Sequence, residues 1–190
     1  ERSRRLCRCR GASNLMSLYH CHDVETLALK LDLWGLIQQG IRRRVAPDLA
    51  DGFILTIASV SVKPSRATRR LGSYSSCAGR PVSVRIQFSQ EMDQLRETFL
   101  HEVAHACDHL HRLPGEHYRQ AHGEGWRTWM ESFGLPGRVR GESPALCQLY
   151  QKRLKVVATC LRCGEEIRRT RRLNRGRRYR HVCGGRIAPV

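Results

Sequence analysis

The sequence predicts an α+β protein in which helices pack on a short, mostly antiparallel sheet, followed by a small separate module at the C-terminal end. Three observations support this prediction. Apolar residues recur every three or four positions within 24–41, 92–110 and 126–133, as on helices with one buried face. Two β-rich runs, 53–62 and 82–88, lie between the first two of these segments. Cysteines with the spacing of metal ligands follow near the C-terminus.

The N-terminal part of the chain is expected to be scaffold. Residues 1–20 are rich in arginine and show no periodicity, which predicts a disordered basic segment. One helix is predicted over residues 24–41. Its apolar residues at helical spacing are Val24, Leu27, Leu31, Trp34, Ile37 and Ile41. The apolar run 53–62 predicts a buried strand. Residues 82–88 alternate between apolar and polar side chains, which predicts a strand with one face in water.

The helix predicted over residues 92–110 carries the most informative motif. Its buried face is formed by Met92, Leu95, Phe99, Val103, Ala106 and Leu110. His101 and His105 lie off the centre of that face. Two histidines four residues apart lie on one side of a helix, so both rings can reach one metal ion with Glu102 beside them. This HExxH pattern is the signature of zinc hydrolases, and it requires a third protein ligand and an open position for water.

The third ligand must come from a segment that folds back after Pro114-Gly115. His109 stands about 12 Å along the helix axis from His101, too far to share its metal, and is expected to be a solvated residue at the helix end. The remaining candidates are Glu116, His117, His122 and Glu124. We favour His122, because the glycines on either side of Glu124 permit a close backbone approach. Glu116 or Glu124 would be the ligand if the site followed a pattern of two histidines and one glutamate.

A second set of metal-ligand residues lies in the last quarter of the chain. Cys160 and Cys163 form a Cys-x-x-Cys pair, and His181 and Cys183 follow after seventeen intervening residues. Two ligand pairs at the ends of a hairpin describe a zinc ribbon, whose closed structural zinc site supplies folding energy to a segment too short for its own core.

The hairpin of this zinc ribbon is expected between the two ligand pairs. Residues 167–172 and 177–180 are predicted as its strands, and 173–176 as the turn that joins them. One feature departs from the usual pattern. A second Cys-x-x-Cys pair would place a cysteine at position 180, where this chain has Arg180 beside His181.

Positive charge is concentrated in the same region. Residues 138–190 hold fifteen Lys and Arg against three Glu, which is +12 of the formal net charge of +17. Such a density on a folded module predicts a nucleic-acid-binding surface that contacts the phosphate backbone, with Tyr179 placed to stack on a base. The alternative is a solvated basic tail.

The chain resembles the SprT-like family of zinc metalloproteases, whose animal members include the Spartan DNA-dependent proteases. The residues that carry the resemblance are 100–106, 121–126, the C-terminal cysteine cluster and a hairpin formed by 70–74 and the strand 82–88. It covers roughly residues 24–187. It implies a zincin-like fold, a catalytic zinc ion, and substrates that are bound or crosslinked to DNA. By this resemblance, His101, His105 and His122 bind the zinc ion, and Glu102 is the catalytic base.

We therefore expect a disordered segment 1–20, a zincin-like metalloprotease domain 21–145 and a basic zinc-ribbon module 150–190, with one catalytic and one structural zinc ion. The expected activity is zinc-dependent cleavage of polypeptides that are bound or crosslinked to DNA. The strand 82–88 is expected to be an edge strand that pairs with the substrate backbone. Besides zinc, Tyr118 is a candidate to stabilise the oxyanion.

Two other functions stay open. The chain could be a nucleic-acid-binding adaptor that does not cut, although the complete set of three histidines and a glutamate argues against this, or a general intracellular peptidase whose charge is incidental. The sequence has no apolar run of membrane-spanning length and no signal peptide, and its nine cysteines fit metal ligands and free thiols better than a disulfide framework. We therefore expect no membrane partner and a reducing compartment, cytoplasm, nucleoid or nucleus, rather than secretion.

Overall fold

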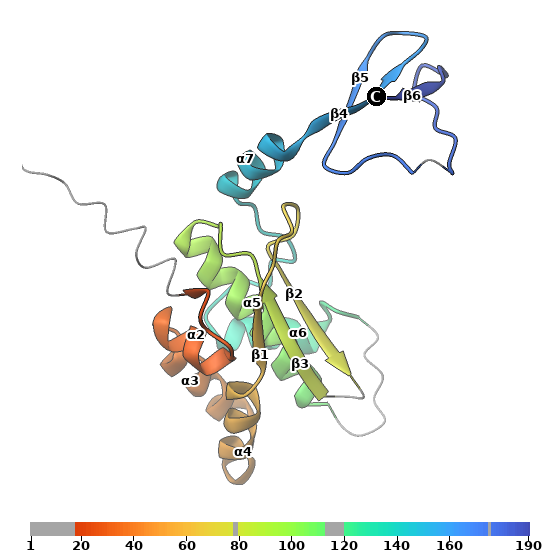
Figure 1. Cartoon of the computed structure of the whole chain (residues 1–190). Helices are drawn as coiled ribbons and strands as arrows, with labels where there is room; N and C mark the ends of the chain where they lie inside the picture. The colour runs from red at the N-terminus through yellow and green to blue at the C-terminus, as the bar shows by residue number, and fades with distance from the viewer. Residues whose placement is uncertain (1–17, 78–79, 113–119, 175) are drawn as a thin grey trace, which may run out of the picture. The chain divides into compact units, whose positions relative to one another are not determined.

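The computed structural model describes residues 18–77, 80–112, 120–174 and 176–190, so most of the segment predicted to be disordered lies outside it. The α+β class is confirmed, with helices and small sheets in two compact units, and the boundary between them in the chain falls between Ser143 and Pro144 (Figure 1). None of the helices in these ranges has the length and apolar character needed to cross a membrane.

The single helix predicted over residues 24–41 is in fact two helices, α2 (Val24–Lys30) and α3 (Trp34–Arg44). Between them Asp32 has a left-handed backbone, with φ of 57°. The N–H groups of Asp32 and Leu33 donate to the carbonyls of Leu29 and Ala28, which closes the end of α2. The prediction was wrong because the break leaves the apolar spacing intact: Trp34 still follows Leu31 by three positions.

The predicted strand 53–62 was also largely wrong. Helix α4 (Pro47–Ala58) occupies most of it, and only the following residues form a strand, β1 (Ser61–Pro64). Pro47 at the start of α4 suits a helix N-terminus. The buried residues of α4 recur at helical spacing: Ala50, Ile54, Ile57 and Ala58. Leu55 between them is 70% exposed, so burial of one helical face outweighs the β propensity of the run.

The sheet of the first unit has three strands in the order β1-β3-β2, with β2 (Gly72–Cys77) and β3 (Arg80–Ile86) as a hairpin. The hairpin is antiparallel, but β1 pairs with β3 in parallel, so the sheet is mixed rather than mostly antiparallel. Strand β3 has neighbours on both sides, which contradicts the expectation that residues 82–88 form an edge strand. The edge strands are β1 and β2. The segment before α2 covers the outer side of β1, where the N–H of Val62 donates to the carbonyl of His22, whereas among the described residues no strand pairs with the outer side of β2. The open edge is therefore that of β2.

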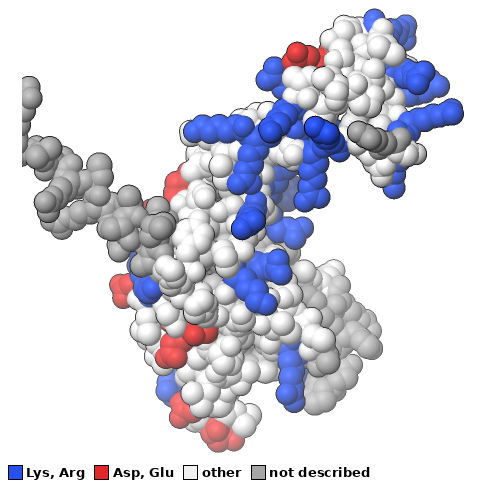
Figure 2. All heavy atoms as spheres, viewed as in Figure 1, with Lys and Arg blue, Asp and Glu red and all other residues white. Residues whose placement is uncertain are grey.

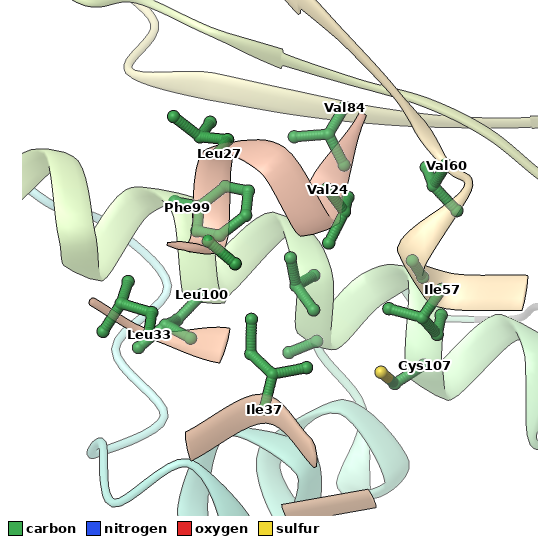
Figure 3. Close-up of a cluster of buried hydrophobic side chains, with 14 of the residues drawn as sticks. Val24, Leu27, Leu33, Ile37, Ile57, Val60, Val84, Phe99, Leu100 and Cys107 are labelled. Atoms are coloured by element: carbon green, nitrogen blue, oxygen red, sulfur yellow. The ribbon is translucent and has the colours of Figure 1, made fainter. Parts of the chain in front are cut away.

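Helix α5 (Met92–Leu110) packs along β2 and β3 and holds the core together. The predicted inward-facing residues Leu95, Phe99, Val103 and Ala106 are completely buried, whereas Met92 at the first position is 42% exposed. Figure 3 shows side chains of α2, α3 and α4 gathered around this helix, with Val84 contributed by β3. Burial of each large side chain of this kind contributes about 1.5–3 kcal/mol.

Helix α6 (Glu124–Ser132) packs on α5 and α3. The residues predicted to form its buried face, Trp126, Trp129, Met130 and Phe133, are all buried. The chain leaves the helix at Gly134, whose φ of 72° is left-handed, as expected of a glycine that follows a helix.

The second unit begins with α7 (Pro144–Arg153) and continues into a three-stranded antiparallel sheet in the order β5-β4-β6. Its strands are β4 (Lys155–Cys160), β5 (Glu166–Arg169) and β6 (Ile187–Pro189). Strand β4 supplies Val157 and Ala158, which are buried. Neither β4 nor β6 was predicted.

The predicted hairpin of residues 167–172 with 177–180 was wrong. Strand β5 pairs with β4 and ends at Arg169, and in 177–180 only Arg180 forms a bridge, to Arg186. The arginine-rich segment has few apolar side chains to bury, so the apolar strand β4 becomes the centre of the sheet. Of the predicted turn 173–176, Arg175 lies outside the described residues, and on either side of it the N–H of Gly176 donates to the side-chain oxygen of Asn174 at 2.9 Å.

Two glycines of α3 provide a test of the packing between α3 and α6. A Cβ at Gly40 would lie 2.7 Å from the buried ring of Phe133, whereas a Cβ at Gly35 would meet nothing within 4 Å. We expect Gly40→Ala to lower the free energy of unfolding by about 1–3 kcal/mol. The control Gly35→Ala should leave it unchanged or raise it by up to about 1 kcal/mol. Urea denaturation measures both, and equal effects would contradict the close contact with Phe133.

Candidate metal centres

Three histidine nitrogens converge in the first unit. His101 and His105 lie one turn apart on α5, and His122 lies just before α6. The Nε2 atom of His101 is 3.2 Å from Nε2 of His105 and 3.2 Å from Nε2 of His122. The structure therefore brings together the three histidines singled out in the sequence, in an arrangement that could hold one metal ion.

Neighbouring groups fix the orientation of these rings. The indole of Trp126 lies against all three rings, with centroid distances of 4.7–5.4 Å, and its Nε1 donates to the carbonyl of His101 at 3.3 Å. The backbone of Arg138 hydrogen-bonds to the His101 ring. A hydrogen bond of this kind to one ring nitrogen leaves the other nitrogen oriented for a metal ion.

The chemistry of this set suits zinc. Burial and the neighbouring His122 lower the pKa of His101 to about 4, and burial together with the two other histidines lowers the pKa of His105 to about 3. Neutral imidazole is the form that binds a metal ion, and a set of three imidazoles is a common catalytic zinc site. Of the other candidates for the third ligand, Glu124 is exposed and does not join the group, and Glu116 and His117 lie outside the described residues.

Glu102 lies beside the histidines and is only 5% exposed. Burial raises its pKa to about 8, although the charge of Arg70 acts in the opposite direction. The first residue of β2 is in close contact with it: a Cβ on Gly72 would lie 2.6 Å from Oε1 of Glu102. Gly72 therefore leaves the space that the carboxyl group occupies.

The histidines and Glu102 line an open cleft of about 790 Å³. Its walls include residues of β2 and α5, among them Ser73, Tyr74 and Thr98. Because β2 is the open edge of the sheet, a groove beside it can accept an extended polypeptide by backbone pairing.

His109 does not join the three histidines, as the distance along the helix predicted. It is less solvated than predicted. It is partly buried, burial lowers its pKa, and the ring of Tyr74 lies 6.1 Å from both His109 and His105. Tyr118, the predicted oxyanion candidate, lies outside the described residues.

In the second unit Cys160, Cys163, His181 and Cys183 converge in the same way. The Sγ atoms of Cys160 and Cys183 are 3.5 Å apart, and Nδ1 of His181 is 3.3 Å from Sγ of both Cys163 and Cys183. His181, rather than the absent cysteine at position 180, completes the group. A set of three thiols and one imidazole fits a closed tetrahedral zinc site.

Local backbone geometry builds this second cluster. Gly164 and Gly184 follow the two ligand pairs with φ of 74° and 81°, where a side chain would be strained. Backbone N–H groups of Cys163 and Arg162 lower the pKa of Cys160 to about 6, which favours the thiolate that binds metal.

The sequence analysis missed one residue of this cluster, Glu165. Its Oε2 atom lies 3.3 Å from Nε2 of His181, while Nδ1 of the same ring faces the thiols. A carboxylate in this position orients a ligand histidine. Two acidic residues, Glu165 and Glu166, follow Cys163 in a segment otherwise rich in arginine, and this was the available signal, although it does not say which of the two contacts His181.

Metal content tests both clusters. We expect two zinc ions per chain in the purified protein by elemental analysis, and one in His122→Ala and in Cys160→Ala. The second variant should also lose folded structure in the C-terminal unit, because that unit has a very small apolar core. A wild-type value near one would exclude one of the two sites, and the variant that leaves this value unchanged identifies it.

The pKa of Glu102 has a consequence for the metal-free protein. Between pH 4.5 and about 8 the folded state keeps a proton that the unfolded state has lost, so the free energy of unfolding falls as pH rises through this window. Glu102→Gln has no such group. After removal of metal by a chelator, the variant should therefore gain stability relative to the wild type by roughly 1–4 kcal/mol between pH 5 and pH 8. Urea denaturation at the two pH values measures this difference, and a constant difference would contradict the raised pKa.

Comparison with known proteins agrees with the geometry of the first cluster. A model described as the SprT-like family matches residues 46–143, which is more than half of the chain. The match includes all three histidines and Glu102, and it ends at the last residue of the first unit. No curated protein and no solved structure gives a significant match. The chain belongs to the SprT-like family.

Proposed function

We propose that the chain is a zinc-dependent endopeptidase that acts on proteins bound or crosslinked to DNA. The observation that carries the proposal is the buried carboxyl group of Glu102 beside three convergent histidine nitrogens, in a cleft along an open strand edge. Membership in the SprT-like family supports the coarser statement that the chain is a metallopeptidase. A zincin-like fold for the first unit is part of the same proposal.

His101, His105 and His122 would hold the catalytic zinc ion. When bound, zinc lowers the pKa of water toward neutrality and polarises a carbonyl group. The role of Glu102 follows from its position. Its carboxylate accepts the proton of the attacking water and passes it to the leaving amine, and a pKa shifted toward neutrality suits a group that must both take and return a proton.

The substrate is held by β2 rather than by β3 in this proposal. Among the described residues no strand pairs with the outer edge of β2 beside the cleft, and an extended polypeptide can add to such an edge as a further strand. Since Gly72 at the start of β2 contacts Glu102, a peptide paired with this strand lies next to the base.

We propose that the C-terminal unit, as a zinc ribbon, brings the enzyme to DNA. Its arginines at 168, 169, 171, 172, 177 and 178 are all exposed. In Figure 2 the Lys and Arg side chains of this unit project from its surface, where few acidic side chains appear. A high density of guanidinium groups favours contact with phosphates. The ring of Tyr179 is partly buried and its hydroxyl accepts from the N–H of Asn174, so base stacking adds little to this surface.

Proteolysis of a DNA-binding protein tests the proposal, with and without single- and double-stranded DNA. We expect the wild type to cleave, and to cleave faster when DNA is present. Glu102→Gln should lose activity about 10²–10⁴-fold, because the variant has no base for the water. The matched control is Glu97→Gln, which changes another carboxyl group of the same cleft and helix and should stay within a few-fold of the wild type.

The alternatives predict different results in the same assay. If the wild type and Glu102→Gln cleave equally, or neither cleaves, the proposed peptidase function is contradicted and a DNA-binding adaptor is favoured. Cleavage that depends on Glu102 but does not respond to DNA would favour a general peptidase. A DNA-binding measurement on the C-terminal arginine variants Arg171→Gln and Arg172→Gln, with Arg42→Gln as the control, then tests the role of the C-terminal unit.

A further inference from the structure

Arginines surround one part of the cleft. The four that line it, here named the arginine cluster, are Arg69, Arg70, Arg138 and Arg140, and all are exposed. The carboxyl groups that line the cleft are those of Glu97 and Glu102. Four guanidinium groups thus face two carboxyl groups in the lining, so the cleft carries more positive than negative charge even before a metal ion adds its own.

The arginine cluster is formed by two segments that meet. One pair directly precedes β2, and the other lies in the segment that follows α6. A Cβ on Gly141 would lie 2.9 Å from Cδ1 of Leu71 and 2.5 Å from Nε2 of Gln94, so the second segment packs on the first, near the beginning of α5. The positive charge thus lies toward the N-terminal end of α5, on one side of the histidines.

Part of this charge is not neutralised by the protein itself. The charge of Arg70 acts on Glu102, whereas no ion pair within the described ranges involves Arg138 or Arg140. A guanidinium group without a carboxylate partner on its own chain is available to a carboxylate of a ligand, which it can bind through two parallel hydrogen bonds.

We propose that the cleft selects polypeptide segments that carry Asp or Glu on one side of the bond to be cut. The inference rests on the proposed peptidase function: a peptide bond that reaches the histidines places its neighbouring residues beside the arginine cluster. Acidic residues there gain charge-assisted hydrogen bonds, whereas lysines and arginines are repelled. The open edge of β2 favours a polypeptide over a nucleic acid strand as the occupant, because its backbone N–H and C=O groups pair with a peptide backbone.

On a DNA-bound protein this selectivity would direct cleavage to acidic segments. The basic segments of such a protein are engaged by phosphates, while acidic ones are repelled from DNA and stay accessible. The basic C-terminal unit and the electropositive cleft would then have separate roles, one for DNA and one for the part of the substrate that DNA leaves free.

The test uses three internally quenched peptides with the same central sequence and acidic, neutral or basic residues on either side. With the zinc-loaded full chain we expect kcat/KM to be at least about tenfold higher for the acidic than for the basic peptide, because one charge-assisted hydrogen bond contributes a factor of this size. Added salt should reduce the ratio. The double variant Arg138→Glu/Arg140→Glu should reverse the preference, mainly through KM. The control Arg43→Glu/Lys63→Glu makes the same change of charge at exposed positions outside the cleft and should keep it.

A second measurement separates this inference from the peptidase function. Fluorescence anisotropy follows binding of the same peptides to zinc-loaded Glu102→Gln, with and without the two arginine substitutions. If no peptide is cleaved but the acidic one binds more tightly in an arginine-dependent manner, the peptidase function fails and the acidic selectivity stands. Equal binding of all three peptides overturns the selectivity. The selectivity is also overturned if a single-stranded oligonucleotide displaces the acidic peptide from the native cleft and binds more weakly to the Arg138→Glu/Arg140→Glu variant.

Discussion

The structure of the first unit depends on the burial of one face of α5. Leu95, Phe99, Val103 and Ala106 on that face are completely buried against the sheet and the other helices. The same helix carries His101, Glu102 and His105, so the packing that stabilises the fold also fixes the two candidate ligands and the proposed base relative to each other. His122 reaches them because Trp126, four residues later on α6, is anchored in the same core and donates to the carbonyl of His101. The hydrophobic core and the candidate site therefore depend on the same buried residues.

The candidate site could be anticipated to a large extent from the sequence. Ligand residues are recognisable because the chemistry demands particular side chains at short, regular spacings. The pair His101 and His105 follows from the geometry of one helical turn, and the two knuckle-like pairs of the C-terminal unit follow from the close approach of ligands that are neighbours in the chain. Glu165 was missed because its role depends on which nitrogen of His181 faces the thiols, which no spacing reveals.

The elements without ligands were harder to predict, for two physical reasons. Local propensity misleads where tertiary packing decides, as in α4, whose isoleucines occupy one helical face instead of a strand. Strand order depends on pairing between distant parts of the chain, which the alternation within one strand does not report. β1 and β2 both pair with β3, so the strand with the clearest alternation is the central one, and β2 is an edge strand. In the second unit, the arginine-rich residues were expected to form a hairpin with each other. The observed sheet is instead built around β4, which has the apolar side chains that can be buried.

The contact between Gly72 and Glu102 limits how this chain can evolve. A single methyl group at position 72 would lie where the carboxyl group of Glu102 lies, and the flexible end of that side chain, rather than the backbone, would have to move. Such a change would leave the buried face of α5 and all seven potential metal ligands in place. Under the proposed function, one added methyl group at position 72 would displace the carboxyl group of the base and keep the potential metal ligands, so a single mutation could turn a peptidase into a protein that binds its target without cutting it.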